Sequence, residues 1–208
     1  MRLPALAALS LIAAPARADD TVPIEPFGSI VRFSPHSPRV VEADHPWRGK
    51  LPVAPIVAMP ERVGAFLNTF TRTKEMNAAL ARTIADAGLA AGSGGSATHR
   101  LTVTWVAFDA PFKIGFSSRV SATLRYELTR VDTGEPVFRR DVTTAATASG
   151  GNAADRMRGV ARAVLSANIA GAIWCLEESP FGRAPVDCAT APQGGFSAPI
   201  TVPIFHPR

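Results

Sequence analysis

The stretch from Arg119 to Thr147 constrains the fold most, because it alternates apolar and polar side chains on either side of a tight turn. In a β-strand successive side chains point to opposite faces. Positions 120, 122, 124, 126 and 128 carry Val, Ala, Leu, Tyr and Leu, whereas the odd positions between them are polar. The residues Asp132-Thr133-Gly134 favour a type I turn followed by a left-handed glycine. The sequence therefore predicts a long β-hairpin with one apolar face.

The turn also predicts which residues face each other across the hairpin. With Val131 opposite Glu135, the polar face forms three complementary pairs, which are Glu127–Arg139, Arg125–Asp141 and Thr123–Thr143. Each pair contributes roughly 0.2–1 kcal/mol, and a slip of one residue would lose all of them. Arg140 is the exception, because it falls on the inner face opposite Tyr126, where it can cover the ring or extend to the sheet edge.

Residues 1–18 predict a secretory signal peptide that is cleaved near Ala18-Asp19. Arg2 precedes an apolar run from Leu3 to Ala14, and small residues occupy positions 16 and 18. An uncleaved anchor helix is the alternative, but the run is short for a bilayer and Pro15 interrupts it. No cysteine stands directly after this apolar run, so a lipoprotein anchor is not expected. We predict a periplasmic or secreted protein with no later transmembrane segment.

Charge and cysteine content agree with export. Loss of Arg2 and Arg17 with the signal peptide lowers the formal charge from +5 to +3. A mildly basic exported protein favours anionic partners such as an anionic glycolipid over nucleic acid, although solubility alone also explains the charge. Cys175 and Cys188 are expected to form a disulfide in an oxidising compartment. A reactive cysteine is the alternative, but the Cys-x-x-Cys spacing is absent.

Proline divides the mature chain into three parts. Residues 19–60 contain eight prolines, residues 61–178 contain two and residues 179–208 contain six. We therefore predict a Pro-rich N-terminal arm at 19–60, a core domain at 61–178 and a Pro-rich C-terminal arm at 179–208. In the N-terminal arm we expect short strands at Ser29–Phe33 and Arg39–Glu42 and an edge strand at Leu51–Met59. We also expect an exposed turn at His45–Arg48, with Trp47 packed inward. In the C-terminal arm, Ile200–Phe205 is expected to pack against the domain.

The core reads as alternating strands and helices. Helical periodicity predicts a helix at Lys74–Ala90 that stops near Gly88, and a second from Ala153 to Leu176 capped by Asn152. Leu101–Asp109 reads as a strand, and the aromatic loop from Ala110 to Ser118 can contact a lipid interface or fold back. The predicted class is α+β: a largely antiparallel sheet of about four strands with two helices on one face, in the order β-α-β-β-β-α.

Motifs of catalysis and metal binding are missing from the sequence. His36, His45, His99 and His206 are scattered without the spacing of metal ligands. The glycines at 92–95 lack the strand and the Lys-Ser/Thr of a phosphate loop, and no Gly-x-Ser-x-Gly elbow occurs. We therefore expect no catalytic residue, no cofactor and no metal.

The element order over about residues 76–176 resembles the small envelope lipoproteins of Gram-negative bacteria typified by LptE and YajG. The resemblance lies in the strand RVSATLRYELTRVDTG, its partner PVFRRDVTT and the alanine-rich helix NAADRMRGVARAVLSANIAGAIWCL. It implies a non-enzymatic helper in outer-membrane assembly or transport, and lipopolysaccharide delivery in the LptE group. This chain departs from those families by lacking the lipid-bearing cysteine and by its Pro-rich arms and cysteine pair.

These observations lead to a functional hypothesis with two alternatives. We expect a periplasmic accessory or binding protein that holds a protein partner or an anionic envelope ligand. The residues expected to make the contacts are Arg119, Arg125 and Arg139 on the outer sheet face and Arg158 and Arg162 on the last helix. The alternatives are a secreted hydrolase, for which His45 and His99 are the residues to replace, and a structural envelope protein.

Overall fold

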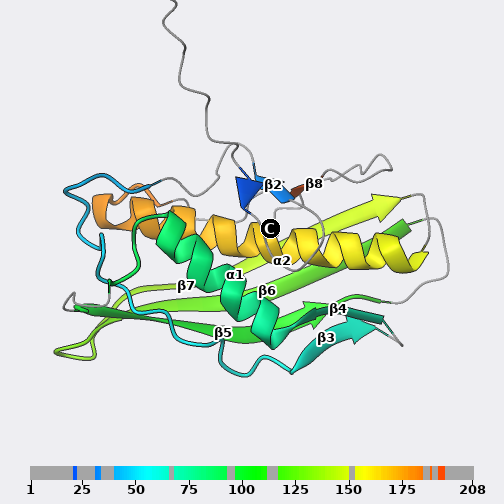
Figure 1. Ribbon diagram of the computed structural model, residues 1–208, viewed down its shortest axis with the longest axis horizontal. Coiled ribbons are helices and arrows are strands. Elements are labelled where there is room, and N and C mark those ends of the chain that lie inside the picture. Colours follow the sequence, from blue (N-terminus) through cyan, green and yellow to red (C-terminus); the bar gives the residue numbers. More distant parts are fainter. Residues whose placement is uncertain are drawn as a thin grey trace, which may run out of the picture.

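The computed structural model describes residues 21–22, 31–33, 40–65, 68–92, 97–111, 117–149, 153–184, 188 and 192–194. Several predicted features lie outside these residues: the signal peptide, the Asn152 cap, most of the aromatic loop and Ile200–Phe205. Figure 1 shows a layered α+β arrangement in which two helices cover one face of the main sheet. The predicted fold class is therefore confirmed.

The main sheet is antiparallel and contains three long strands in the order β5-β6-β7. A two-stranded sheet, β3-β4, and a small sheet, β1-β2-β8, accompany it. The strands are β1 (Thr21–Val22), β2 (Val31–Phe33), β3 (Arg62–Ala65), β4 (Asn68–Arg72), β5 (His99–Asp109), β6 (Ser117–Arg130), β7 (Pro136–Ser149) and β8 (Pro192–Gly194). The helices are α1 (Thr73–Asp86), α2 (Ala153–Glu178) and the 3-10 turn η1 (Ser179–Phe181).

The β6–β7 hairpin has the predicted register along its length. Arg125 faces Asp141, Glu127 faces Arg139, and the hydroxyls of Thr123 and Thr143 lie 2.9 Å apart. Gly134 has a φ of +69°, as the turn requires.

The register prediction is wrong at the tip of the hairpin. Val131 does not pair with Glu135, because a bulge shifts the ladder so that Thr129 faces Pro136, and Arg130 N–H donates to the Glu135 carbonyl. Arg140 does face Tyr126, but its side chain is exposed at the sheet edge.

Other elements correct the sequence reading in detail. Helix α1 ends at Asp86, and Gly88 follows it with a φ of +75°, which confirms the glycine stop. Residues 40–42 of the expected strand at 39–42 are not a strand. Leu51, Val53 and Val57 make isolated parallel bridges rather than a regular strand: Val53 and Val57 pair with the edge of β5, whereas Leu51 pairs with Ala90. The β3–β4 hairpin was not predicted at all.

Helix α2 is the central element of the core. It contacts β6 and β7 of the main sheet on one side, and α1 and β4 on another. It also contacts the short strands β2 and β8 (Figure 1). Its length and composition would suffice for a membrane span, contrary to the expectation that no segment after residue 18 is apolar enough. However, 89% of its apolar window is buried inside the protein, so its apolar residues form the core.

The C-terminal arm is attached to this helix by a disulfide. Cys175 near the end of α2 is bonded to Cys188, and both are buried. Strand β8 then pairs with β2 from the N-terminal arm. Short parts of the two Pro-rich arms therefore meet beside α2, on the side away from the main sheet (Figure 1).

Candidate functional site

Three of the predicted contact residues, Arg119, Arg125 and Arg139, lie on the outer face of the main sheet, opposite the helices. Two of them are neutralised by carboxylates across the hairpin. Arg125 donates two hydrogen bonds to Asp141, of 2.7 and 2.8 Å, and Arg139 lies 3.5 Å from Glu127. The hydrogen bond from Arg125 lowers the pKa of Asp141 below its usual value.

Arg158 and Arg162 are on α2, as predicted, but each also has a partner within the protein. Arg158 forms an ion pair with Asp155 one helical turn earlier, at 3.3 Å. Arg162 donates from Nε to the carbonyl of Phe70 in β4, at 2.9 Å. Burial lowers the pKa of Arg162, and the nearby charge of Arg158 adds to the effect. The bond of Arg162 attaches α2 to β4, whereas the pair of Arg158 lies within the helix.

The five predicted arginines do not form one site. Arg119, Arg125 and Arg139 are on one face of the sheet, whereas Arg158 and Arg162 belong to a helix that covers the other face (Figure 1). Arg119, Arg125 and Arg139 are exposed or half-buried on the outer sheet face, whereas Arg158 and Arg162 are half-buried on α2, and the sheet separates the two groups.

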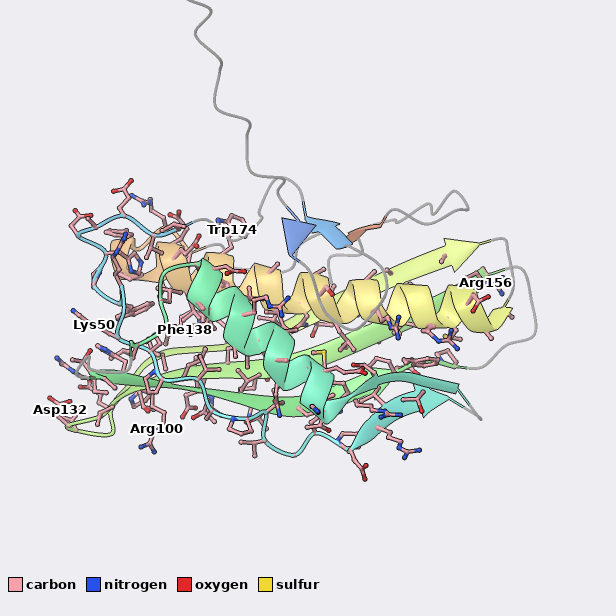
Figure 2. The ribbon with its side chains drawn as sticks, in the orientation of Figure 1. Lys50, Arg100, Asp132, Phe138, Arg156 and Trp174 are labelled. Atoms are coloured by element: carbon pink, nitrogen blue, oxygen red, sulfur yellow. A yellow bond between two sulfur atoms is a disulfide. The ribbon has the colours of Figure 1, made fainter. Side chains whose placement is uncertain are left out.

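The structure instead gathers polar and aromatic residues at the end that holds the hairpin tip. The two histidines considered for a hydrolase, His45 and His99, pack edge-on and tilted against the indole of Trp47, with ring centroids 5.9 and 6.1 Å from it. Figure 2 shows Lys50, Arg100 and Asp132 at this same end, and Arg156 at the opposite end of the molecule. The predicted turn at 45–48 is present, with Trp47 packed inward, but His45 is also buried.

His45 has a structural environment. Its Nδ1 accepts a hydrogen bond from the Trp47 N–H at 3.2 Å, so the ring proton must be on Nε2 in the neutral form. Nε2 lies 3.1 Å from the carbonyl of Glu177 and donates to it. Both ring nitrogens are therefore used, and only 5% of the residue is exposed. This arrangement joins the N-terminal arm to the end of α2 and leaves no nitrogen for proton transfer.

His99 lies in a different environment, in the wall of a cavity of about 280 Å³. We call this the tip cavity; it is lined by Ala97, Thr98, His99, Arg130, Val131 and Asp132. Thr98 Oγ1 lies 2.9 Å from His99 Nδ1. Burial lowers the pKa of His99 below its usual 6.5, and the charges of Arg130 and Lys50 lower it further, whereas Asp132 acts in the opposite direction.

A second cavity of about 280 Å³ lies at the C-terminal end of α2. We call it the helix-end cavity; its lining includes Glu42, His45, Glu177, Glu178, Phe181 and Arg183. Arg183 is held by Glu178 at 2.6 Å and lies over the Phe181 ring, 4.6 Å from its centroid. Its single basic side chain is therefore already paired with a carboxylate.

Within the part of the chain that the structure describes, no three His, Cys, Asp or Glu residues could hold a metal ion. The tip cavity was missed by sequence reasoning, because its walls come from residues 97–99 and 130–132, separated by two long strands. One signal was available in the order of the strands. If β5 pairs antiparallel with β6, the first residues of β5 must lie beside the last residues of β6, at the hairpin tip.

No family model matches the chain, and no curated protein sequence matches it. Ten chains of solved structure match its fold. A Xanthomonas campestris protein of the family DUF330 is 13% identical, with a TM-score of 0.44, over 53% of this chain and 63% of that protein. A candidate lipoprotein from Caulobacter crescentus CB15 is 11% identical, with a TM-score of 0.41, over 55% of this chain and 86% of that protein. The chain thus spans less than two thirds of the Xanthomonas protein.

Proposed function

We propose that the protein is a non-enzymatic periplasmic accessory protein of envelope assembly or transport, which holds a protein partner or an anionic envelope ligand. The observation that carries the proposal is the open outer face of the main sheet. Both helices cover the other face, and no helix of the described chain covers this one (Figure 1). Its described side chains are half-buried or exposed, and they are polar along β6 and, apart from Ala145, along β7 from Arg139 to Thr147.

This face is well suited to binding because it is fixed in shape. The Arg125–Asp141 pair and the Thr123–Thr143 hydrogen bond hold its side chains in one arrangement. A preorganised surface loses less conformational entropy when it binds a partner. Paired charges also contribute specificity more than affinity, since a partner must match their pattern.

The compartment is proposed from chemistry and from the N-terminal sequence. A buried disulfide joins Cys175 to Cys188, and disulfides persist in oxidising compartments such as the periplasm. The apolar run and small-residue cleavage pattern of residues 1–18 support export.

The proposal can be tested with a photo-crosslinking amino acid at Ser121, on the outer face, in cells that export the protein. A matched site is Arg82, which is exposed on α1 on the other side of the sheet. We expect a discrete cross-linked protein or lipid species from position 121 and none from position 82. Equal labelling from both positions, or none from position 121, would remove the outer face as the binding surface.

Charge reversal tests the electrostatic part of the same proposal. Arg119→Glu combined with Arg139→Glu should reduce capture from position 121, and the difference should shrink as salt is raised. Arg82→Glu with Arg62→Glu changes the net charge equally at exposed residues away from the main sheet and should leave capture unchanged. Unchanged capture by the outer-face variant would mean that its charges do not contribute.

One observation favours the alternative of a secreted hydrolase: the hydrogen bond between the Thr98 hydroxyl and His99 Nδ1 resembles a nucleophile and its base. His99 and Thr98 line the tip cavity, whose one carboxylate among the described residues is Asp132. This carboxylate lies 3.8 Å from Arg130 and accepts a hydrogen bond from the Thr133 N–H. Screening with soluble ester, phosphate and glycoside substrates would decide. Activity that is lost in both Thr98→Ala and His99→Ala would replace the accessory-protein proposal.

A further inference from the structure

We propose that the tip cavity binds a phosphate-type oxyanion, recognised by the side chains of Arg130, Lys50 and His99. The inference goes beyond the proposed function, because it adds an anion site in the tip cavity, apart from the outer face of the main sheet. The five arginines predicted from the sequence are not the residues involved.

The geometry comes from the pairing of β5 with β6. His99 is the first residue of β5 and lies directly opposite Arg130, the last residue of β6. The backbone beside them is fixed, since the Val131 N–H donates to the Thr98 carbonyl at 2.9 Å. Both side chains border the same cavity of about 280 Å³, which is open to solvent and adds a hydroxyl from Thr98. Arginine and hydroxyl donors of this kind are common ligands of phosphate oxygens.

Lys50 adds a permanent positive charge at this end of the molecule (Figure 2). Its backbone N–H donates to the carbonyl of Trp47 at 3.2 Å, and the Trp47 ring lies 6.1 Å from the ring of His99. Lys50 itself is not among the residues that line the cavity. The charges of Lys50 and Arg130 both act on His99 and lower its pKa, after burial, which is the largest cause. A bound anion would offset this positive potential and raise the pKa of His99.

Asp132 is the group that opposes anion binding in this cavity. Its carboxylate lies 3.8 Å from Arg130 Nε, and its side chain is 71% exposed. An exposed ion pair of this length contributes little, so an incoming oxyanion can displace it at small cost. Its Oδ1 also accepts a hydrogen bond from the Thr133 N–H. Replacing Asp132 by Asn removes the opposing charge while an amide oxygen can keep that bond.

The experiment is an NMR titration of the His99 ring in the full mature chain with its disulfide intact. Inorganic phosphate is added at constant ionic strength made up with sodium chloride, because screening alone would raise the pKa of His99. We expect a saturable rise of this pKa. Arg130→Gln should weaken phosphate binding about tenfold, the value of one lost charged hydrogen bond. Lys50→Gln should weaken it less, and Asp132→Asn should strengthen it.

A matched control is Arg62→Gln, in β3, which lies away from the hairpin tip (Figure 1). It removes one positive charge from an exposed position and should leave phosphate binding unchanged. Arg130 is half exposed, so its replacement should leave the fold intact, and the dispersion of the amide spectrum verifies this.

The source of the phosphate group is tested in separate arms. Vesicles of phosphatidylglycerol are compared with vesicles of phosphatidylcholine in a flotation assay, alongside free phosphate. Flotation with the anionic vesicles that depends on Arg130 would indicate a lipid headgroup, whereas a response to phosphate alone would indicate a soluble ligand.

The inference is overturned if His99 responds to phosphate no more than to chloride and neither vesicle binds, or if Arg62→Gln reduces binding as much as Arg130→Gln. Such results would not affect the proposed function, whose cross-linking test uses the outer sheet face. A specific cross-link at position 121 together with no phosphate response would separate the two.

Discussion

Asn168 lies in the middle of α2 with its side chain fully buried, and it joins the helix to both strands of the hairpin. Its Nδ2 donates to the Val142 carbonyl at 2.8 Å, and its Oδ1 accepts from the Tyr126 hydroxyl at 3.0 Å. Burial raises the pKa of Tyr126, so the hydroxyl stays protonated and acts as a donor. Buried polar groups of this kind fix one arrangement of a helix on a sheet, because any shift would leave them unsatisfied.

Replacing Asn168 by Ala should lower the free energy of unfolding by about 2–4 kcal/mol, since it leaves buried groups unpaired and creates a cavity. Tyr126→Phe removes one hydroxyl and keeps the ring, and should cost about 1 kcal/mol. Urea denaturation of the oxidised protein measures both. Equal losses for the two variants would show that the amide contributes nothing beyond its bond to the tyrosine.

The alternation of side chains was sufficient to place Tyr126 on the inner face, since a strand leaves only two choices. It could not find the partner on α2. Asn168 interrupts an otherwise apolar part of the helix, and only the packing of helix on sheet places its amide near the Tyr126 hydroxyl.

At the scale of elements, the β6–β7 hairpin was predictable because its register is determined locally, by its turn and by complementary pairs. The predicted pairing at its tip was wrong by one residue, because the sequence does not show which residue a bulge leaves unpaired. The β3–β4 hairpin was missed for another reason. Its strands are four and five residues long, and short strands depend on tertiary packing more than on their own pattern.

The turn of the β6–β7 hairpin allows a direct test. Gly134 has a φ of +69° and no other atom would lie within 4 Å of an added Cβ, so Gly134→Ala should cost about 1 kcal/mol through backbone strain alone. Gly92→Ala is the control, because that site is equally open and its φ is not in the left-handed region. Thermal unfolding measures both, and equal stability of the two variants would contradict the expectation.

At the scale of the whole molecule, α2 is enclosed between the main sheet and the short strands of the arms. The distribution of proline predicted two arms, but the pairing of β2 with β8 could not be predicted, since the two strands are separated by most of the chain. The tip cavity was hidden for the same reason. Its residues are brought together by antiparallel pairing rather than by any spacing within one segment.

The disulfide should be the main constraint on the C-terminal arm. Its cysteines are 13 residues apart, and closing such a loop stabilises the folded state by about 3 kcal/mol in the chain-entropy model. Replacing Cys175 and Cys188 together by Ala should therefore lower the melting temperature, and the wild-type protein should approach the same value under reducing conditions. No difference between oxidised wild type and the variant would mean that the crosslink does not contribute.

The segment from Val53 to Val57, which lies along β5, has a consequence for self-assembly. Val57 donates to the Val103 carbonyl and accepts from the Trp105 N–H, and the neighbouring Pro52 and Pro55 have no N–H to offer. Among the described strands, β7 pairs with β6 alone, so β7 is the open border of the described main sheet. Two molecules joined there would leave no open border among the described strands of their main sheets. Strand addition at this border would therefore end at a pair.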